Sequence, residues 1–206
     1  MMPILMLVST LLTGESEFQL EAPVQCGGTD AILQYDDGTA QWLSYDRQFS
    51  ATWFHLEDFQ AGATGCQIQA TEYWFYHHVG SYHLYWDTSI FAAQVWSGGP
   101  SGPDEMIDCS SATAVNFAPV FVDYIPPLQV PADFWLITRH SLWNGSPTPV
   151  MDIEAAPGPH SFWRNPDMTE WEPLIGDLLY RVHGNLLGLE EDTWGAIKVL
   201  FGARGR

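Results

Sequence analysis

The chain has few basic residues. It carries 25 acidic residues against 7 basic ones, and its single lysine is Lys198. Three of the basic residues lie in the last nine positions, so the rest of the chain is almost without cations. Because so acidic a surface repels phosphate groups, we expect neither nucleic acid nor an anionic membrane as a partner. Divalent cations remain possible partners of such an acidic surface. The simpler explanation of the acidity is solubility in an extracellular medium.

Cysteine is also scarce, with only Cys26, Cys66 and Cys109. No C-x-x-C pair occurs, so the sequence does not support a structural zinc site. An exported protein could join two of the three in a disulfide, and every pairing is possible. We favour Cys66–Cys109, because both lie inside the expected domain while Cys26 lies in a glycine-rich segment before it. Closing that loop of about 43 residues would stabilise the fold by roughly 4 kcal/mol.

Long hydrophobic runs are absent from the sequence. The most apolar segment, Pro3–Thr13, has the length of the hydrophobic region of a signal peptide and is too short to span a bilayer as a helix. Small residues follow at Gly14 and Ser16, where a peptidase could cut. The sequence therefore predicts a signal peptide over residues 1–14, a secreted or cell-surface protein, and no transmembrane segment. The run lacks Lys and Arg, and the alternative is that it forms a first strand.

The sequence does contain many short β-like runs separated by Gly and Pro turn signals. This pattern predicts an all-β domain, an antiparallel, jelly-roll-like β-sandwich, over residues 31–184, preceded by a linker at 15–30. Residues 185–206 would form a C-terminal tail in which Thr193 could cap a short helix. The predicted strands are Ala31–Tyr35, Ala40–Tyr45, Ser50–Leu56, Cys66–His77, Ser89–Trp96, Ala112–Phe117, Val120–Ile125, Phe134–Thr138 and Leu178–His183.

Alternation within two of these runs predicts which side chains face the core. In residues 178–182 the even-numbered positions are apolar and share one face, opposite Arg181. In the run from 66 to 77, Glu72 interrupts the apolar face. Two explanations are open: a β-bulge near Thr71 resets the phase, or the second half of the strand is covered on both faces.

Three stretches resemble β-sandwich modules of large secreted or surface proteins of bacteria. They are QYDDGTAQW, DFWLIT and WEPLIGDLLYRVHG, and the resemblance covers roughly residues 30–184. Those modules often open with a YDDG-type turn and close with a Trp followed by a Gly-Asp-led apolar strand that carries Arg. The resemblance implies an extracellular accessory or adhesive role. The segment TWGAIKVLF is similar to short C-terminal tails of exported proteins of some uncultured bacteria.

Asp36, Asp37 and Gly38 form the sharpest polar turn in the sequence. The two carboxylates could offer oxygens to Ca²⁺, which takes six to eight oxygen ligands. The simpler explanation is a hairpin turn, in which Asp-Gly is a favoured pair. Calcium, bound by Asp36 and Asp37, is the only cofactor that the sequence suggests.

Aromatic side chains are abundant, at 14% of the chain with ten Trp. Trp and Tyr suit sugar stacking, because the ring face is apolar and the polar atom lies at the edge. We expect Tyr82, Tyr85 and Trp86 to be the best ligand candidates, since they lie in an expected loop. The alternative is that most aromatics pack in the core or cover a sheet face. The wider candidate platform comprises Trp74, Tyr76, Tyr82, Tyr85, Trp86 and Trp96.

Signals of catalysis are weak. Glu170 with Glu172, and Asp152 with Glu154, are carboxylate pairs of the kind that glycoside hydrolysis uses, but so acidic a chain contains such pairs by chance. No nucleophile elbow, Cys nucleophile signature or P-loop occurs, and we do not expect an enzyme.

The leading hypothesis is a non-catalytic secreted or surface module for adhesion or extracellular assembly, which calcium could stabilise, with a glycan or protein partner. The alternative is a carbohydrate-binding module that uses loop aromatics, and a glycoside hydrolase-like enzyme ranks third.

Overall fold

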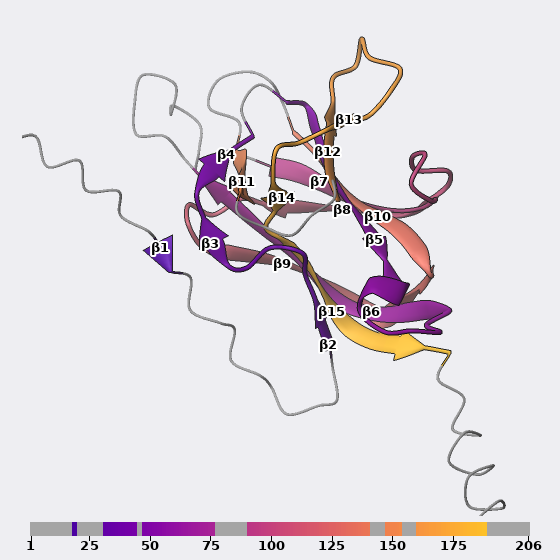
Figure 1. The fold of residues 1–206 in the computed structure, drawn as a ribbon. Helices are drawn as coiled ribbons and strands as arrows, with labels where there is room; N and C mark the ends of the chain where they lie inside the picture. The colour runs from indigo at the N-terminus through magenta and orange to yellow at the C-terminus, as the bar shows by residue number, and fades with distance from the viewer. Residues whose placement is uncertain are drawn as a thin grey trace, which may run out of the picture.

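The structure is that of an antiparallel β-sandwich. The computed structural model describes residues 18–19, 31–44, 47–76, 90–140, 147–153 and 160–188. Within these ranges every element is a strand except one 3₁₀ turn at Leu56–Asp58. The strands form two main sheets that pack on each other (Figure 1). The predicted all-β sandwich is confirmed, whereas the signal peptide at 1–14 and the C-terminal helix around Thr193 lie outside the described residues.

The first sheet has six strands in the order β13-β12-β5-β10-β7-β8. Its central strands β5, β10 and β7 form continuous antiparallel ladders, and β12 extends the sheet beyond β5. The bounds are β5 Phe49–His55, β7 Ile90–Ser97, β8 Met106–Thr113, β10 Asp133–Arg139, β12 Ser161–Arg164 and β13 Glu172–Pro173.

The second sheet has seven strands, five of them in the order β14-β11-β6-β15-β2, while β4 pairs with β11 and β9 pairs with β6. A separate two-stranded ladder joins β1 (Phe18–Gln19) to β3 (Thr39–Ala40). The chain crosses between the two main sheets at most successive strands from β5 onward, which suits the jelly-roll-like arrangement. The bounds are β2 Ala31–Leu33, β4 Trp42–Leu43, β6 Gly65–Tyr76, β9 Pro119–Pro131, β11 Thr148–Asp152, β14 Asp177–Leu178 and β15 Tyr180–Leu187.

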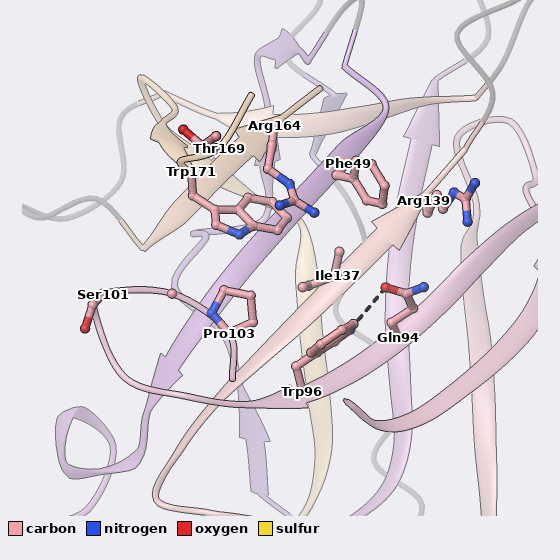
Figure 2. A pocket seen from close by; sticks show the side chains of 11 residues that line it. Phe49, Gln94, Trp96, Ser101, Pro103, Ile137, Arg139, Arg164, Thr169 and Trp171 are labelled. Atoms are coloured by element: carbon pink, nitrogen blue, oxygen red, sulfur yellow. Dashed lines mark hydrogen bonds between the residues drawn. The ribbon is translucent and has the colours of Figure 1, made fainter. Parts of the chain in front are cut away.

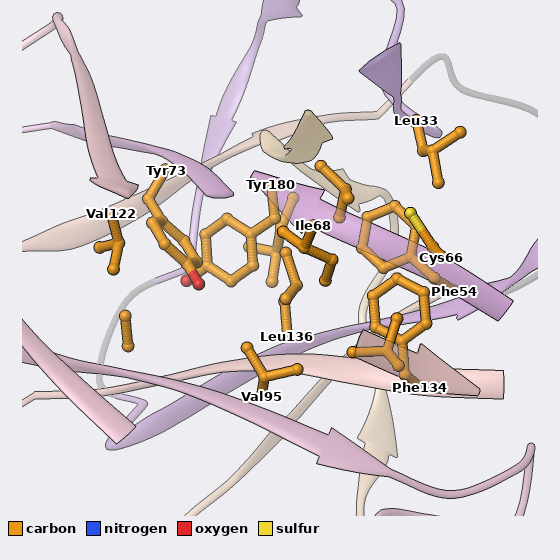
Figure 3. Close-up of a cluster of buried hydrophobic side chains, with 14 of the residues drawn as sticks. Leu33, Phe54, Cys66, Ile68, Tyr73, Val95, Val122, Phe134, Leu136 and Tyr180 are labelled. Atoms are coloured by element: carbon orange, nitrogen blue, oxygen red, sulfur yellow. The ribbon is translucent and has the colours of Figure 1, made fainter. Parts of the chain in front are cut away.

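The main core lies between the sheets and is rich in aromatic rings (Figure 3). Phe54 of β5 stacks on Phe134 of β10 with ring centroids 5.2 Å apart. Tyr180 of β15 meets the ring of Tyr73 edge-on at 5.0 Å, and its hydroxyl lies 2.5 Å from that of Thr138 on the facing sheet. This hydrogen bond satisfies the polar atoms of a fully buried tyrosine, so the ring can contribute its whole apolar area to the core.

Strand β6 shows why its apolar pattern changes phase. Its pairing with β9 and with β15 shifts in register next to Gln69. Before the shift Ile68 faces the core, and after it Tyr73 does. Trp74 is also buried, on the opposite face. The predicted bulge is therefore confirmed, and the second half of the strand is covered on both faces as well.

Three sequence-based boundaries differ from the structure. The run Ala112–Phe117 is wrong as a strand, because β8 ends at Thr113 and Phe117 takes a left-handed φ of 50°. The prolines at 126 and 127, which belong to the Pro turn signals of the sequence, lie inside β9 and do not end the predicted strand Val120–Ile125. Strand β9 tolerates them because it is an edge strand with a register shift there. Strand β15 continues to Leu187, four residues beyond the predicted strand end at His183 and three beyond the expected end of the domain at residue 184.

Candidate functional site

A second cluster of apolar side chains covers the face of the six-stranded sheet that points away from the main core. Because side chains alternate along a strand, Trp135 and Ile137 of β10 lie on this outer face while their neighbours face the core. Aromatic rings surround them on every neighbouring strand. The cluster contains Ala51, Trp135 and Ile137, with Phe49, Trp53, Trp96, Phe162 and Trp171 packed against them.

Part of this outer face is hollowed into a cavity of about 460 Å³ (Figure 2). That volume is within the usual range for small-molecule sites. Ile137 lies in its floor, with Trp96 and Trp171 on opposite sides. The lining residues are Phe49, Gln94, Trp96, Ser101, Gly102, Pro103, Ile137, Arg139, Arg164, Thr169 and Trp171.

Strand register places two arginines on either side of one phenylalanine. Arg139 of β10 is the cross-strand partner of Phe49 on β5, and Arg164 of β12 is the partner of Phe49 on its other side. The guanidinium carbons lie 5.7 and 5.1 Å from the centroid of the Phe49 ring. Arg164 is also 5.1 Å from the ring of Trp171. Both cations are therefore held over aromatic faces at distances where cation–π attraction operates.

A tight loop after β7 builds one wall of the cavity. Gly98 has φ 135°, and a Cβ there would collide with the backbone of Gly102, so only glycine suits this position. The indole nitrogen of Trp135 donates to the carbonyl of Gly99 at 3.1 Å and ties the loop to the sheet. Ser101 and Pro103 thereby reach the cavity on a loop that is anchored at its base.

The opposite wall comes from the loop after β12. The ring of Trp171 meets Phe49 edge-on at 6.4 Å and lies 5.9 Å from Trp135. On the far side, the indole of Trp96 donates to the side-chain oxygen of Gln94 at 3.1 Å. That bond leaves the Gln94 amide nitrogen free to donate elsewhere, and its one side-chain hydrogen bond among the described residues is a weak one of 3.9 Å to the Cys109 sulfur. The cavity thus combines fixed aromatic walls with amide, hydroxyl and guanidinium donors.

Among the described residues, the cavity gathers two of the few positive charges of this acidic chain. Of the four arginines among the described residues, two line the cavity, and neither has an ion-pair or hydrogen-bond partner within those residues. None of the eleven lining residues is acidic. A third arginine, Arg47, stacks over Trp163 at 3.4 Å and does not line the cavity. The side chains that line the cavity therefore carry positive charge, in contrast to the net charge of −18 of the whole chain.

The expected calcium ligands have other partners. Both side-chain oxygens of Asp36 accept hydrogen bonds from Arg181, at 2.6 and 3.2 Å, in a fully buried ion pair. Asp37 is exposed and accepts from the backbone nitrogen of Thr39 at 2.7 Å. Calcium at this turn stays a prediction, and it would require Asp36 to give up Arg181. Among the described residues, no group of three or more His, Cys, Asp or Glu side chains is arranged to hold a metal ion.

Arg181 also pairs with Glu72, at 3.3 Å, so one cation serves two buried carboxylates. Burial raises the pKa of Asp36, and the pairing with Arg181 offsets part of that shift. Burial would also raise the pKa of Glu72, but hydrogen bonds from His183 and Trp74 and the charge of Arg181 outweigh it, so the pKa is lowered. A buried ion pair with Arg181 therefore fixes the YDDG turn to strand β15 of the second sheet.

The expected Cys66–Cys109 disulfide is not formed in the structure, where both cysteines are free. Cys66 faces the main core from β6, and burial raises the pKa of its thiol to about 12. Cys109 is exposed on β8, opposite Gln94 on the outer face of the other sheet. The six-stranded sheet therefore lies between the two side chains, with Cys66 in the core on one side and Cys109 on the outer face. A disulfide cannot bridge that separation.

The other sequence-based candidates are divided between described and undescribed residues. Tyr82, Tyr85 and Trp86 lie outside the described residues, as does Glu154. Glu170 and Glu172 flank Trp171 but are exposed and do not line the cavity. Among the members of the wider aromatic platform that the structure describes, only Trp96 lines the cavity, and Trp74 is buried on the outer face of the second sheet.

Sequence reasoning missed the arginines and Trp171. No clear signal marked strand β12, because its four residues, Ser161–Arg164, are too few to show an alternation.

Comparison with known proteins gave no match to a protein-family model, a curated protein or a solved structure. Within the described ranges, no helix combines the length and the apolar character that crossing a bilayer requires.

Proposed function

We propose that this chain is an exported, non-catalytic β-sandwich module that binds extracellular carbohydrate in the cavity on its outer face. The observation that carries this proposal is the lining itself, in which Phe49, Trp96 and Trp171 surround hydrogen-bonding groups. A sugar ring has apolar C–H faces and polar edges, so it matches aromatic walls with donors between them.

The chemistry of the lining favours binding over reaction. Glycoside hydrolysis needs two carboxyl groups across the scissile bond, and the lining residues offer guanidinium, amide and hydroxyl groups instead. The walls are also fixed before any ligand arrives, because Trp96 is tied to Gln94 and the loop before Pro103 is tied to Trp135. A rigid site loses little conformational entropy on binding, which suits adhesion.

The test is a glycan array probed with the purified chain and with two aromatic variants. Trp171→Ala removes one wall of the cavity and should abolish binding to the glycans that the wild-type chain binds on the array. The control is Phe121→Ala, which removes an exposed aromatic ring from β9 of the other sheet and should leave binding unchanged. Thermal melting of each variant confirms that it is folded. Equal loss in both variants, or glycan binding that survives Trp171→Ala, would contradict the proposal.

A further inference from the structure

The cavity also carries the positive charges of two arginines, which a neutral sugar does not neutralise. We infer that its preferred ligand is an anionic saccharide, whose carboxylate or sulfate group is bound by Arg139 and Arg164. The inference rests on the proposed function, since it takes carbohydrate as the ligand class and specifies its charge.

The first argument is the unpaired state of the two arginines. The sequence has 25 acidic residues, so carboxylates are abundant partners on this surface. Even so, Arg139 and Arg164 contact rings only, within the part of the chain that the structure describes. The Nε atom of Arg164 is buried and has no hydrogen-bond partner there. Two like charges beside one ring repel each other, and a bound anion would relieve that repulsion.

The second argument is the position of the two guanidinium groups beside aromatic rings, with their central carbons 5.1 to 5.7 Å from the ring centroids. A contact with a ring does not use up the N–H groups of a guanidinium, so they stay able to donate to acceptors. Those N–H groups match carboxylate and sulfate oxygens in paired hydrogen bonds. Because Arg139 and Arg164 lie on either side of the same ring, Phe49, an anionic substituent bound above that ring would lie between two positive charges.

The third argument is the contrast between the cavity and the rest of the protein. A net charge of −18 repels anions at long range, so non-specific attraction of an acidic glycan is not expected. An anionic ligand therefore gains binding only where local cations outweigh that repulsion, and the cavity supplies two of them without any acidic lining residue. Ring faces from Trp96 and Trp171 then distinguish a sugar from a flexible acidic chain.

The experiment compares ligands that differ in charge but share a ring. Binding to the purified chain is measured by calorimetry at 150 mM NaCl with oligogalacturonate and with its neutral methyl ester. Dextran sulfate tests sulfate as the source of the anion, and polyglutamate tests an acidic chain without sugar rings. We expect oligogalacturonate, dextran sulfate or both to bind at least tenfold more tightly than the methyl ester and polyglutamate.

Arginine variants then assign the preference to the cavity. Arg139→Gln and Arg164→Gln should each lower affinity for the anionic saccharide roughly tenfold or more, and by a clearly larger factor than affinity for the methyl ester, because only the acid loses a charge-assisted contact. Arg164→Lys keeps the charge but loses the paired geometry and should fall between. The matched control is Arg47→Gln, which removes a stacked arginine outside the cavity and should have no effect.

The outcomes separate this inference from the proposed function. The inference fails if the methyl ester binds as tightly as the acid, or if the preference survives both Arg→Gln changes. The cavity would then bind sugar regardless of its charge, and the proposed function would stand. If polyglutamate binds as tightly as the acidic saccharide, the cavity reads charge without the ring and the inference also fails. If no saccharide binds, both proposals fail.

Discussion

Removing Arg181 should be the most damaging single charge substitution on the described part of the chain. Its guanidinium is 3% exposed and is the shared partner of Asp36 and Glu72. Arg181→Met keeps most of the side-chain volume but leaves two carboxylates buried without their cation. Breaking a buried ion pair in this way costs about 3–5 kcal/mol. For a domain of this size that corresponds to a fall of roughly 6–20 °C in melting temperature.

The assay is urea unfolding at pH 7 and pH 5, followed by intrinsic fluorescence. Without Arg181 the pKa of Asp36 and of Glu72 should rise, because burial is no longer opposed by a positive charge. A carboxyl group whose folded pKa lies above its unfolded pKa loses stability as the pH rises through that interval. The penalty of Arg181→Met should therefore be larger at pH 7 than at pH 5, and adding Asp36→Asn should recover part of it.

Arg47→Met serves as the control, because Arg47 stacks on a ring and has no carboxylate partner among the described residues. It should cost less than about 1 kcal/mol, as most surface substitutions do. The reasoning is refuted if Arg181→Met also costs less than about 1 kcal/mol, or if its penalty does not depend on pH.

Three further predictions follow from the backbone, the thiols and a histidine. Gly184→Ala should destabilise the fold by several kcal/mol in urea unfolding, because a Cβ there would collide with the backbone of β6 at its register shift. An unchanged free energy of unfolding would show that β15 and β6 separate easily at this point. Cys109 should react with iodoacetamide in the native protein while Cys66 reacts only after unfolding, as peptide mass spectrometry would show; equal labelling or a disulfide between them would contradict the structure. A hydrogen bond of 2.8 Å to Asp133 raises the pKa of His55, so the stability that this pair adds is complete below the unfolded value near pH 6.5 and is lost as the pH rises through the folded pKa. Asp133→Asn should lower the His55 pKa in an NMR titration, and an unchanged value would exclude the pairing.

Local patterns were enough to predict the fold class and much of the strand detail. The even positions of 178–182 face the main core, as their alternation predicts, and Arg181 lies on the opposite face. The phase change before Tyr73 was visible as an interruption at Glu72. These features depend only on neighbours along the chain, where side-chain direction alternates with each residue.

The cavity depends on register between distant strands, which local patterns do not encode. Phe49 and Arg164 are cross-strand partners although more than a hundred positions separate them. Arg139 and Phe49 each lie one residue outside a predicted strand, and β12 is too short to show a clear alternation. The ion pair between Asp36 and Arg181 was not predicted for the same reason, because the two residues are 145 positions apart and meet only through the packing of distant segments.

The most direct test of the central claim is an NMR titration of the tryptophan indole N–H signals with the tightest-binding glycan from the array. The account predicts that the signals of Trp96 and Trp171 shift in a saturable way, because both rings line the cavity. The signal of Trp74 should stay in place, because its indole is buried on the other sheet and donates to Glu72 at 2.5 Å. If Trp86 shifts while Trp96 and Trp171 do not, glycan binds at the loop that the sequence suggested and the cavity is not the site.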